Sequence, residues 1–244
     1  MSLALFADVH GNFEALEACL KHARDRGAAR YAFLGDLVGY GADPAAVVDI
    51  VRELASEGAV VVQGNHDAAV GRYEGGMSES AQPGISWARK ALEGRAKHWL
   101  ESLPLCIRDG PMCFVHASAA NPGRWEYVDC AEAAKKSADA AGVPWTFCGH
   151  VHQQALFFEV SGGKMSSFTP VPGSAFPMRR NRRWVAIVGS VGQPRDRNPA
   201  AAYALFDGGS ETLTFYRVPY DYAAATRKLR AARLPENLPW SAGP

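Results

Sequence analysis

The chain has 244 residues, of which 48% are apolar and 21% charged, the balance of an ordinary globular protein. Its formal net charge of +1 excludes a general electrostatic attraction to nucleic acid or to an anionic membrane. The five cysteines are scattered without a CxxC pair, which argues against a disulfide framework and a thiolate zinc site. No apolar run approaches the ~20 residues of a membrane span, and the first residues lack a basic secretion signal, so we expect a cytoplasmic setting.

The first sixty residues alternate between short apolar runs and helical patterns. Strands are predicted at 3–7, 31–34 and 60–62, and helices at 13–26 and 44–56. Phe13, Leu16 and Leu20 recur at helical spacing in the first helix. Asp43 as N-cap and Pro44 in the first turn start the second. This β-α-β-α-β order predicts parallel strands joined by crossover helices.

The later chain changes character after residue 154. Before it, helices are predicted at 80–103, with an interruption near Gly94, and at 131–141, and strands at 112–115 and 145–148. After it, strands are predicted at 156–160, 164–169, 183–188, 202–206 and 212–217, followed by a helix at 220–233. We therefore expect one α/β domain over residues 1–234 with two sheets face to face, and a loose tail over 235–244.

Five predicted strands each end in residues that can bind a metal ion. In chain order these are Asp8-x-His10, Gly35-Asp36, Gly64-Asn65-His66-Asp67, His116 and Gly149-His150-x-His152. Ligands bind at the carboxyl ends of strands in open α/β sheets, so these groups can converge. Residues two apart lie on one side of an extended chain, which places both side chains of each D-x-H or H-x-H pair within reach of one ion. A mixed Asp/His/Asn set without cysteine favours Mn, Fe, Co, Ni or Zn over Ca.

Each of these residues also has a structural interpretation when taken alone, as a helix cap, a turn residue or a buried histidine. The ordered set favours metal binding, and His22 and His98 lie outside it. Asn12 and Tyr40 lie beside ligand loops and either contact substrate or only shape turns. Arg195 either binds a phosphate through two N–H groups or belongs to a solvated loop with a surface ion pair. The basic run at 179–183 is either a solvated turn or the rim of a site for an anionic substrate.

The set resembles the calcineurin-like metallophosphoesterase superfamily, whose motifs are D-x-H, G-D, G-N-H-[DE], H and G-H-x-H in this order. The resemblance covers Asp8 to His152 and implies a four-layer α/β sandwich of two mixed β-sheets flanked by helices. It also implies a metal-dependent phosphoric ester hydrolase that uses two divalent ions, with manganese favoured, and a metal-bound hydroxide as the nucleophile. Its substrate would be a phosphorylated small molecule or a nucleotide.

The resemblance also assigns roles to individual residues. One metal would be bound by Asp8, His10, Asp36 and His152. The other would be bound by Asp36, Asn65, His116 and His150, with Asp36 shared. His66 would be the general acid beside the leaving group, and Asp67 would be the carboxylate that orients it.

One departure from the motifs of the superfamily narrows the range of substrates. The protein phosphatases of the superfamily and the diadenosine tetraphosphate hydrolases carry G-D-x-V-D-R-G, whereas this chain has Gly-Asp-Leu-Val-Gly-Tyr-Gly over 35–41 and lacks the arginine. The opening Asp-Val-His-Gly-Asn and the later Gly-Ser-Val-Gly-Gln-Pro-Arg-Asp are similar to a small bacterial and archaeal branch. Two alternatives stay open, which are a protein or nucleotide phosphatase of narrower substrate and a catalytically silent metal-binding scaffold.

Overall fold

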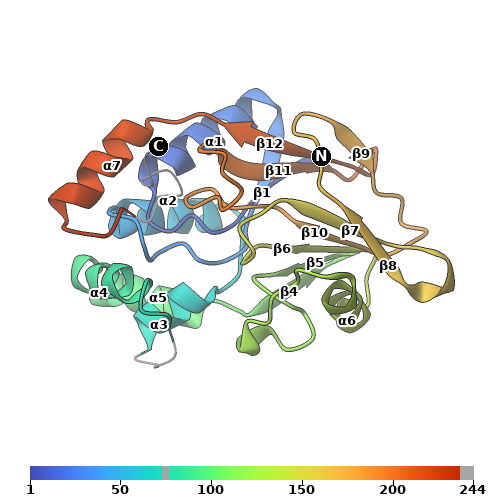
Figure 1. The fold of residues 1–244 in the computed structure, drawn as a ribbon, viewed down its shortest axis with the longest axis horizontal. Coiled ribbons are helices and arrows are strands. Elements are labelled where there is room, and N and C mark those ends of the chain that lie inside the picture. Colours follow the sequence, from blue (N-terminus) through green and yellow to red (C-terminus); the bar gives the residue numbers. More distant parts are fainter. Residues whose placement is uncertain (73–76, 237–244) are drawn as a thin grey trace.

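Two mixed six-stranded sheets form the centre of the computed structural model, which describes residues 1–72 and 77–236 (Figure 1). The first sheet has, in spatial order, β3 (Val60–Val61), β2 (Ala28–Phe33), β1 (Ser2–Phe6), β11 (Ala201–Asp207), β12 (Thr212–Val218) and β9 (Ala175–Pro177). The second has β4 (Cys106–Asp109), β5 (Met112–Val115), β6 (Trp145–Cys148), β10 (Trp184–Ile187), β7 (Ala155–Glu159) and β8 (Met165–Phe168). The four-layer fold expected from the sequence is confirmed.

Seven helices flank the two sheets within the described residues. They are α1 (Phe13–Asp25), α2 (Pro44–Ser56), α3 (Asn65–Gly71), α4 (Gln82–Ala91), α5 (Gly94–Ser102), α6 (Ala131–Ala141) and α7 (Tyr222–Ala231). Figure 1 shows α1 and α2 beside the first sheet and α6 beside the second. None of the helices in the described part of the chain has the length and apolarity needed to cross a membrane.

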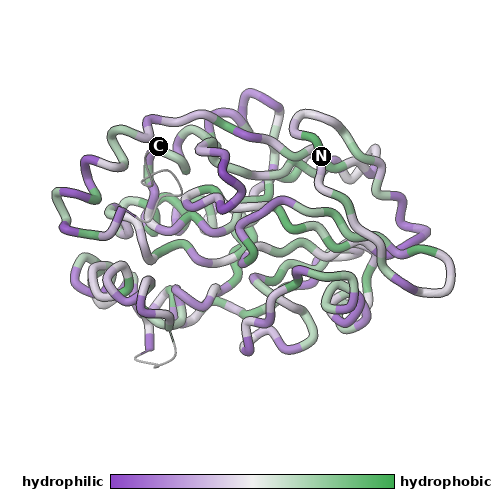
Figure 2. The backbone as a smooth tube through the Cα atoms, in the orientation of Figure 1, coloured by the Kyte–Doolittle hydropathy of each residue, from purple (hydrophilic) through white to green (hydrophobic). Residues whose placement is uncertain are grey.

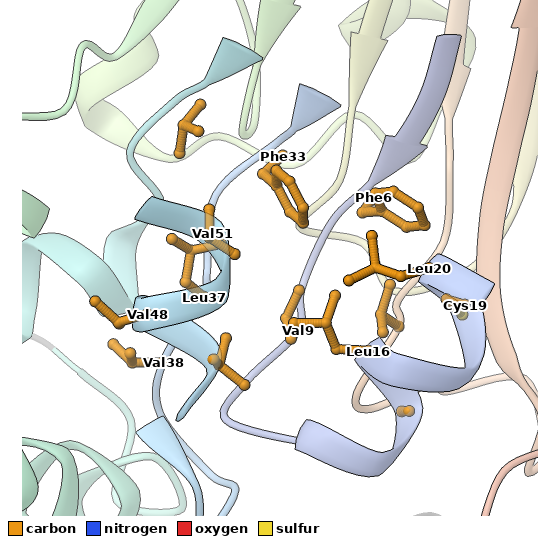
Figure 3. Packing of buried hydrophobic residues seen from close by; sticks show 14 of the residues in the cluster. Phe6, Val9, Leu16, Cys19, Leu20, Phe33, Leu37, Val38, Val48 and Val51 are labelled. Atoms are coloured by element: carbon orange, nitrogen blue, oxygen red, sulfur yellow. The ribbon is translucent and has the colours of Figure 1, made fainter. Parts of the chain in front are cut away.

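The central strands β1, β6 and β10 are buried on both faces, which explains their continuous apolar runs. Leu5 on β1 and Phe147 on β6 belong to the cluster between the two sheets. Phe6, the next residue on β1, turns to the other face and packs with Leu16 and Leu20 of α1 (Figure 3). Alternate side chains of one strand thus serve two layers, and Figure 2 shows hydrophobic residues along these central strands.

The local signals at α1 and α2 correspond to contacts in the structure. The side chain of Asn12 caps α1 by accepting a hydrogen bond from the backbone N–H of Ala15 (3.2 Å). Pro44 begins α2 as predicted, but the side chain of Asp43 makes no capping hydrogen bond and instead pairs with Lys228 of α7 (2.8 Å). The ion pair ties α7 to the start of α2.

The predicted order of elements matches the structure apart from α3, β4 and β9, which were not predicted. Helix α3 begins inside the Gly-Asn-His-Asp motif, which is typical of a turn, and β4 and β9 are short outer strands without a buried residue. The predicted interruption near Gly94 is confirmed by the separation of α4 from α5. The domain boundary at residue 234 stays a prediction, and the predicted tail lies outside the described residues from 237 onward.

The topology brings the metal-competent loops to one edge. Strands β1, β2 and β3 pair in parallel in the first sheet, and β5, β6 and β10 pair in parallel in the second. All five motifs follow the carboxyl end of one of these strands, and the two sheets pack face to face through a shared apolar cluster. The loops of both sheets therefore meet at a common rim.

Candidate metal centre

The first of two buried clusters at this rim consists of Asp8, His10 and His152, none more than 2% exposed. His152 Nε2 lies 3.2 Å from His10 Nε2 and 3.2 Å from Asp8 Oδ1. The Nδ1 atoms face backbone carbonyls, that of Val38 for His10 (3.1 Å) and that of Gln193 for His152 (2.7 Å). Because a carbonyl oxygen only accepts, each Nδ1 carries a hydrogen and each neutral ring presents a lone pair at Nε2.

Three electron-rich atoms therefore face one another in the first cluster. Asp8 Oδ1 is buried and has no hydrogen-bond donor in the described part of the chain, an arrangement that is costly without a compensating partner. A divalent cation among the carboxylate oxygen and the two imidazole nitrogens would satisfy all three. The donor set thus fits a metal ion, and the carbonyls hold the rings in the tautomer that a metal requires.

The second cluster consists of Asp36, Asn65, His116 and His150. His116 Nε2 lies 3.0 Å from His150 Nδ1, 3.1 Å from Asn65 Oδ1 and 3.4 Å from Asp36 Oδ2. The opposite nitrogen of His116 faces the carbonyl of Leu34 (2.8 Å), so its Nε2 also points into the cluster. The four residues come from both sheets and offer two nitrogens and two oxygens to one point.

Asp36 lies between the two clusters and divides its oxygens between two tasks. Oδ1 accepts a hydrogen bond from the backbone N–H of His66 (2.8 Å). Oδ2 lies 3.7 Å from His10 Nε2 and 3.4 Å from His116 Nε2, and hence beside both clusters. One carboxylate is thus placed to contact two cations at once.

The ligand loops have an unusual backbone. Asp8, His10, Asp36, His150 and His152 all have left-handed φ values between 49° and 65°. Such residues cost of order 1–3 kcal/mol each and cluster at functional sites; Asp and His tolerate the conformation better than most. Our expectation that each D-x-H or H-x-H pair reaches one ion along an extended chain was wrong. The backbone is left-handed at each of these residues, and although Asp8 and His10 share the first cluster, His150 and His152 lie in different clusters.

Asp67 supports the loop around Asp36. Its fully buried carboxylate accepts hydrogen bonds from the backbone N–H groups of Asp36 (2.8 Å), Leu37 (2.9 Å), Val38 (3.3 Å) and Gly64 (2.9 Å). These four contacts hold the strand end that carries Asp36 against the start of α3. The sequence had suggested His66 as the partner of this carboxylate, whereas these contacts are to backbone.

Burial governs the protonation of the site imidazoles. It lowers the pKa of His10 well below its usual value and the pKa of His150 to about 4, which favours the neutral form that binds metals. For His116 burial acts in the same direction, but the adjacent Asp36 carboxylate outweighs it and raises the pKa to about 9. A cation bound at Asp36 would offset that carboxylate and replace the proton.

A hollow of about 220 Å³ opens over the second cluster. Its lining contains Asp36, Tyr40, Asn65, His66, Met77, Ser78, Tyr127, His150, His152 and Arg195. Of the three residues suggested as substrate contacts, Tyr40 and Arg195 line this hollow. Asn12 does not, because its amide caps α1 and donates to the carbonyl of Gly192 (3.1 Å) and the hydroxyl of Tyr220 (3.2 Å).

The basic run at 179–183 lies away from this hollow. Arg180 pairs with Glu211, and Arg183 pairs with Glu159 and Asp139. The two histidines outside the motifs also lie elsewhere. His22 Nδ1 contacts the hydroxyl of Tyr203 (2.8 Å), and His98 is exposed on α5.

Several site residues were not found from the sequence. The carbonyls that orient the ligand imidazoles carry no side-chain signature, and Ser190, whose hydroxyl donates to the carbonyl of Asp8 (2.8 Å), lies 182 residues away in sequence. Trp125 and Tyr127 follow β5 and place their rings beside His116 and His150. A polar loop with two aromatics between His116 and α6 was the only signal for them.

Comparisons with known proteins give the family and the fold of the chain. A family model described as the calcineurin-like phosphoesterase superfamily domain matches residues 1–211. The chain is 32% identical to an uncharacterized protein of Methanocaldococcus jannaschii over 244 residues, which cover 97% of this chain and 95% of that protein. The crystal structure of a metallophosphoesterase from Sphaerobacter thermophilus is 35% identical, with a TM-score of 0.85 over 98% of each chain. A hypothetical protein of Pyrococcus horikoshii shares the fold at 18% identity, with a TM-score of 0.78 over 98% of this chain and 96% of that one.

Proposed function

Because the chain belongs to the calcineurin-like phosphoesterase superfamily, we propose that it hydrolyses a phosphomonoester or phosphodiester with two divalent cations bound in the two clusters. Phosphoester hydrolysis follows from the family; the pair of cations and the residue roles are our extension. When bound, two such ions supply an activated water and neutralise the charge that develops at phosphorus.

The observation that carries the proposal is the pair of facing Nε2 atoms of His10 and His152, 3.2 Å apart. Both rings are anchored through Nδ1, so neither can turn a hydrogen toward the other without becoming charged. With the unpartnered Asp8 Oδ1 beside them, this arrangement is favourable only with a cation. We assign Asp8, His10, Asp36 and His152 to one ion and Asp36, Asn65, His116 and His150 to the other.

The donor atoms of the ligands narrow the choice of metal ion but leave several candidates. Nitrogen and oxygen donors without sulfur suit Mn, Fe, Zn, Co and Ni, and we favour manganese. We also propose the cytoplasm as the compartment, because five scattered cysteines without a CxxC pair suit a reducing environment.

His66 is the proposed proton donor to the leaving group. The structure gives it no hydrogen bond from either ring nitrogen to any described residue; Nδ1 is buried without a partner and Nε2 lies 3.9 Å from Asp36 Oδ2. His10, His116 and His152, by contrast, are each anchored to a carbonyl. An imidazole that lines the hollow and whose ring nitrogens make no hydrogen bond to a described residue is available to transfer a proton.

Two further residues are proposed to position the phosphate. Arg195 lines the hollow from an exposed loop, and its guanidinium can bind a phosphate through two N–H groups. Tyr40 packs its ring against both His10 and His66, at centroid distances of 4.8 Å. It therefore fixes the angle between a metal ligand and the proposed acid.

The test is a hydrolysis assay with p-nitrophenyl phosphate and bis-p-nitrophenyl phosphate after loading with each divalent metal in turn. We expect turnover that chelation abolishes and manganese restores, and the ratio of the two rates reports monoester or diester preference. His152→Ala should lose the turnover, whereas the exposed His98→Ala should keep it. Chelation-resistant turnover would contradict the proposal, and a metal-loaded protein without turnover would favour the scaffold alternative.

A further inference from the structure

Two aromatic residues of the loop between β5 and α6 lie against the imidazoles of the second cluster. The ring of Tyr127 stacks on that of His150, with centroids 4.2 Å apart and planes inclined by 22°. Trp125 meets the ring of His116 edge-on at 5.8 Å. Each ring touches an imidazole that belongs to the same cluster, although neither tyrosine nor tryptophan is needed to bind the ion.

The backbone of this loop is shaped to present these rings. Trp125 has a left-handed φ of 56°, which is rare and unfavourable for a bulky residue. It follows a short 3-10 turn over Pro122–Arg124. Strain of this kind persists where the surrounding structure holds the chain in place for a purpose.

Tyr127 differs from the other aromatic residues in being open to solvent. Its exposed fraction is 50%, and it is the one aromatic residue among the exposed large hydrophobic residues of the described chain. It also lines the hollow over the second cluster. One face of its ring lies on His150, so the exposure belongs to the opposite face and the ring edge. An exposed aromatic face at the mouth of a polar hollow has no role in the packing of the core.

We propose that Tyr127 is a stacking platform that gives the site a preference for phosphoesters bearing a planar heteroaromatic group, the chemistry of a nucleotide base. The inference rests on the proposed function, because the cations and Arg195 would bind the phosphate end of the same substrate. Stacking between a base and an aromatic side chain tolerates any base, since each has a π face. The platform therefore selects for the presence of a base more than for its identity.

The order of the rings makes this geometry consistent. His116, His150 and Tyr127 follow one another outward from the second cluster, His116 contacting His150 at 3.0 Å and His150 stacking on Tyr127. A planar group on the free face of Tyr127 would extend this series by one layer. The phosphate would remain at the cations while its substituent lies along the wall of the hollow.

The test compares two competitive inhibitors that differ only in the base. Inhibition constants of adenosine 5′-monophosphate and ribose 5-phosphate are measured against turnover of p-nitrophenyl phosphate or its bis ester, whichever is hydrolysed. In the native protein we expect the nucleotide to bind roughly tenfold or more tightly, the lower part of the range that base stacking gives. Tyr127→Leu, which keeps the bulk but loses the π face, should bring the ratio close to one, and Tyr127→Phe should preserve it.

Inorganic phosphate and metal content serve as controls. The inhibition constant of inorganic phosphate and the metal content should both be unchanged in Tyr127→Leu, because the variant leaves His150 and the cations in place. Equal binding of the two inhibitors to the native protein would overturn the inference, as would a nucleotide preference that survives Tyr127→Leu. Weaker binding of phosphate and both inhibitors by one common factor would assign Tyr127 a positioning role on His150 instead. In each of these cases p-nitrophenyl turnover persists, whereas its absence would count against the proposed function itself.

Discussion

The backbone N–H of His150 donates a 2.9 Å hydrogen bond to Oδ2 of Asp8, across 142 residues of sequence and across the junction of the two sheets. The bond occupies one carboxylate oxygen and leaves Oδ1 directed at His10 and His152. Asp36 is divided in the same way, with Oδ1 bound to a backbone N–H and Oδ2 facing both clusters. In each of the two carboxylates, a hydrogen bond from the backbone thus holds one oxygen, and the other oxygen is directed to where a cation would bind.

Asp36→Asn should weaken both cation sites together. The substitution removes the negative charge at the one oxygen that faces both clusters, while an amide oxygen can still accept the backbone bond from His66. Elemental analysis after dialysis should show the metal content falling from about two ions per chain toward none. Loss of a single ion would contradict a bridging role.

His66→Ala should retain metal and lose turnover mainly on substrates with a poor leaving group. A proton donor matters most when the leaving group is a poor one, so we expect a rate loss of about 10²–10⁴-fold for alkyl phosphoesters. The loss should be much smaller for p-nitrophenyl esters, whose leaving group needs little protonation. Equal losses on both kinds of substrate, with metal content intact, would remove the acid role from His66.

Asp67→Asn should lower the free energy of unfolding as well as the rate of turnover. The amide would direct N–H groups at backbone N–H groups of the Asp36 loop, and an unsatisfied buried group costs about 1–3 kcal/mol. Urea unfolding of the metal-free protein measures this loss, with the exposed His98→Ala as the control of unchanged stability. A variant as stable as the native protein that merely reproduces the kinetics of His66→Ala would show that Asp67 acts through His66.

Chelation should lower the melting temperature, because an ion that binds only the folded chain stabilises it. The gain is about 2.7 kcal/mol when the free ion is at 100 times its dissociation constant. The shift between chelator and manganese should shrink in His152→Ala, which removes a nitrogen of the first cluster, and stay intact in His98→Ala. A shift of equal size in both variants would place the stabilising ion elsewhere.

The sequence was sufficient to predict the strands that carry the ligands, because each is an apolar run that ends at a glycine or a polar residue. It was sufficient for the convergence of the ligands as well, since parallel strands end at one edge. It did not predict β4, whose Cys106–Asp109 stretch has little apolar character, or β9, which ends in Pro177. Outer strands of this kind are defined by their neighbours more than by their own residues.

The parts of the site that the sequence could not reveal depend on backbone geometry and on long-range contacts. The left-handed conformations of Asp8 and His152 have no sequence signal comparable to glycine. The carbonyls of Val38 and Gln193 orient two imidazoles whatever side chains those residues bear. The partner of Asp67 was inferred from a motif, and only the folded chain shows that its four contacts are to backbone.

The central claim is that two cations occupy the two clusters, and anomalous diffraction from crystals grown with manganese tests it most directly. The account predicts two anomalous peaks, one among Asp8, His10, His152 and Asp36 and the other among Asp36, Asn65, His116 and His150. Peaks at other positions, or none at this rim in crystals saturated with manganese, would contradict it.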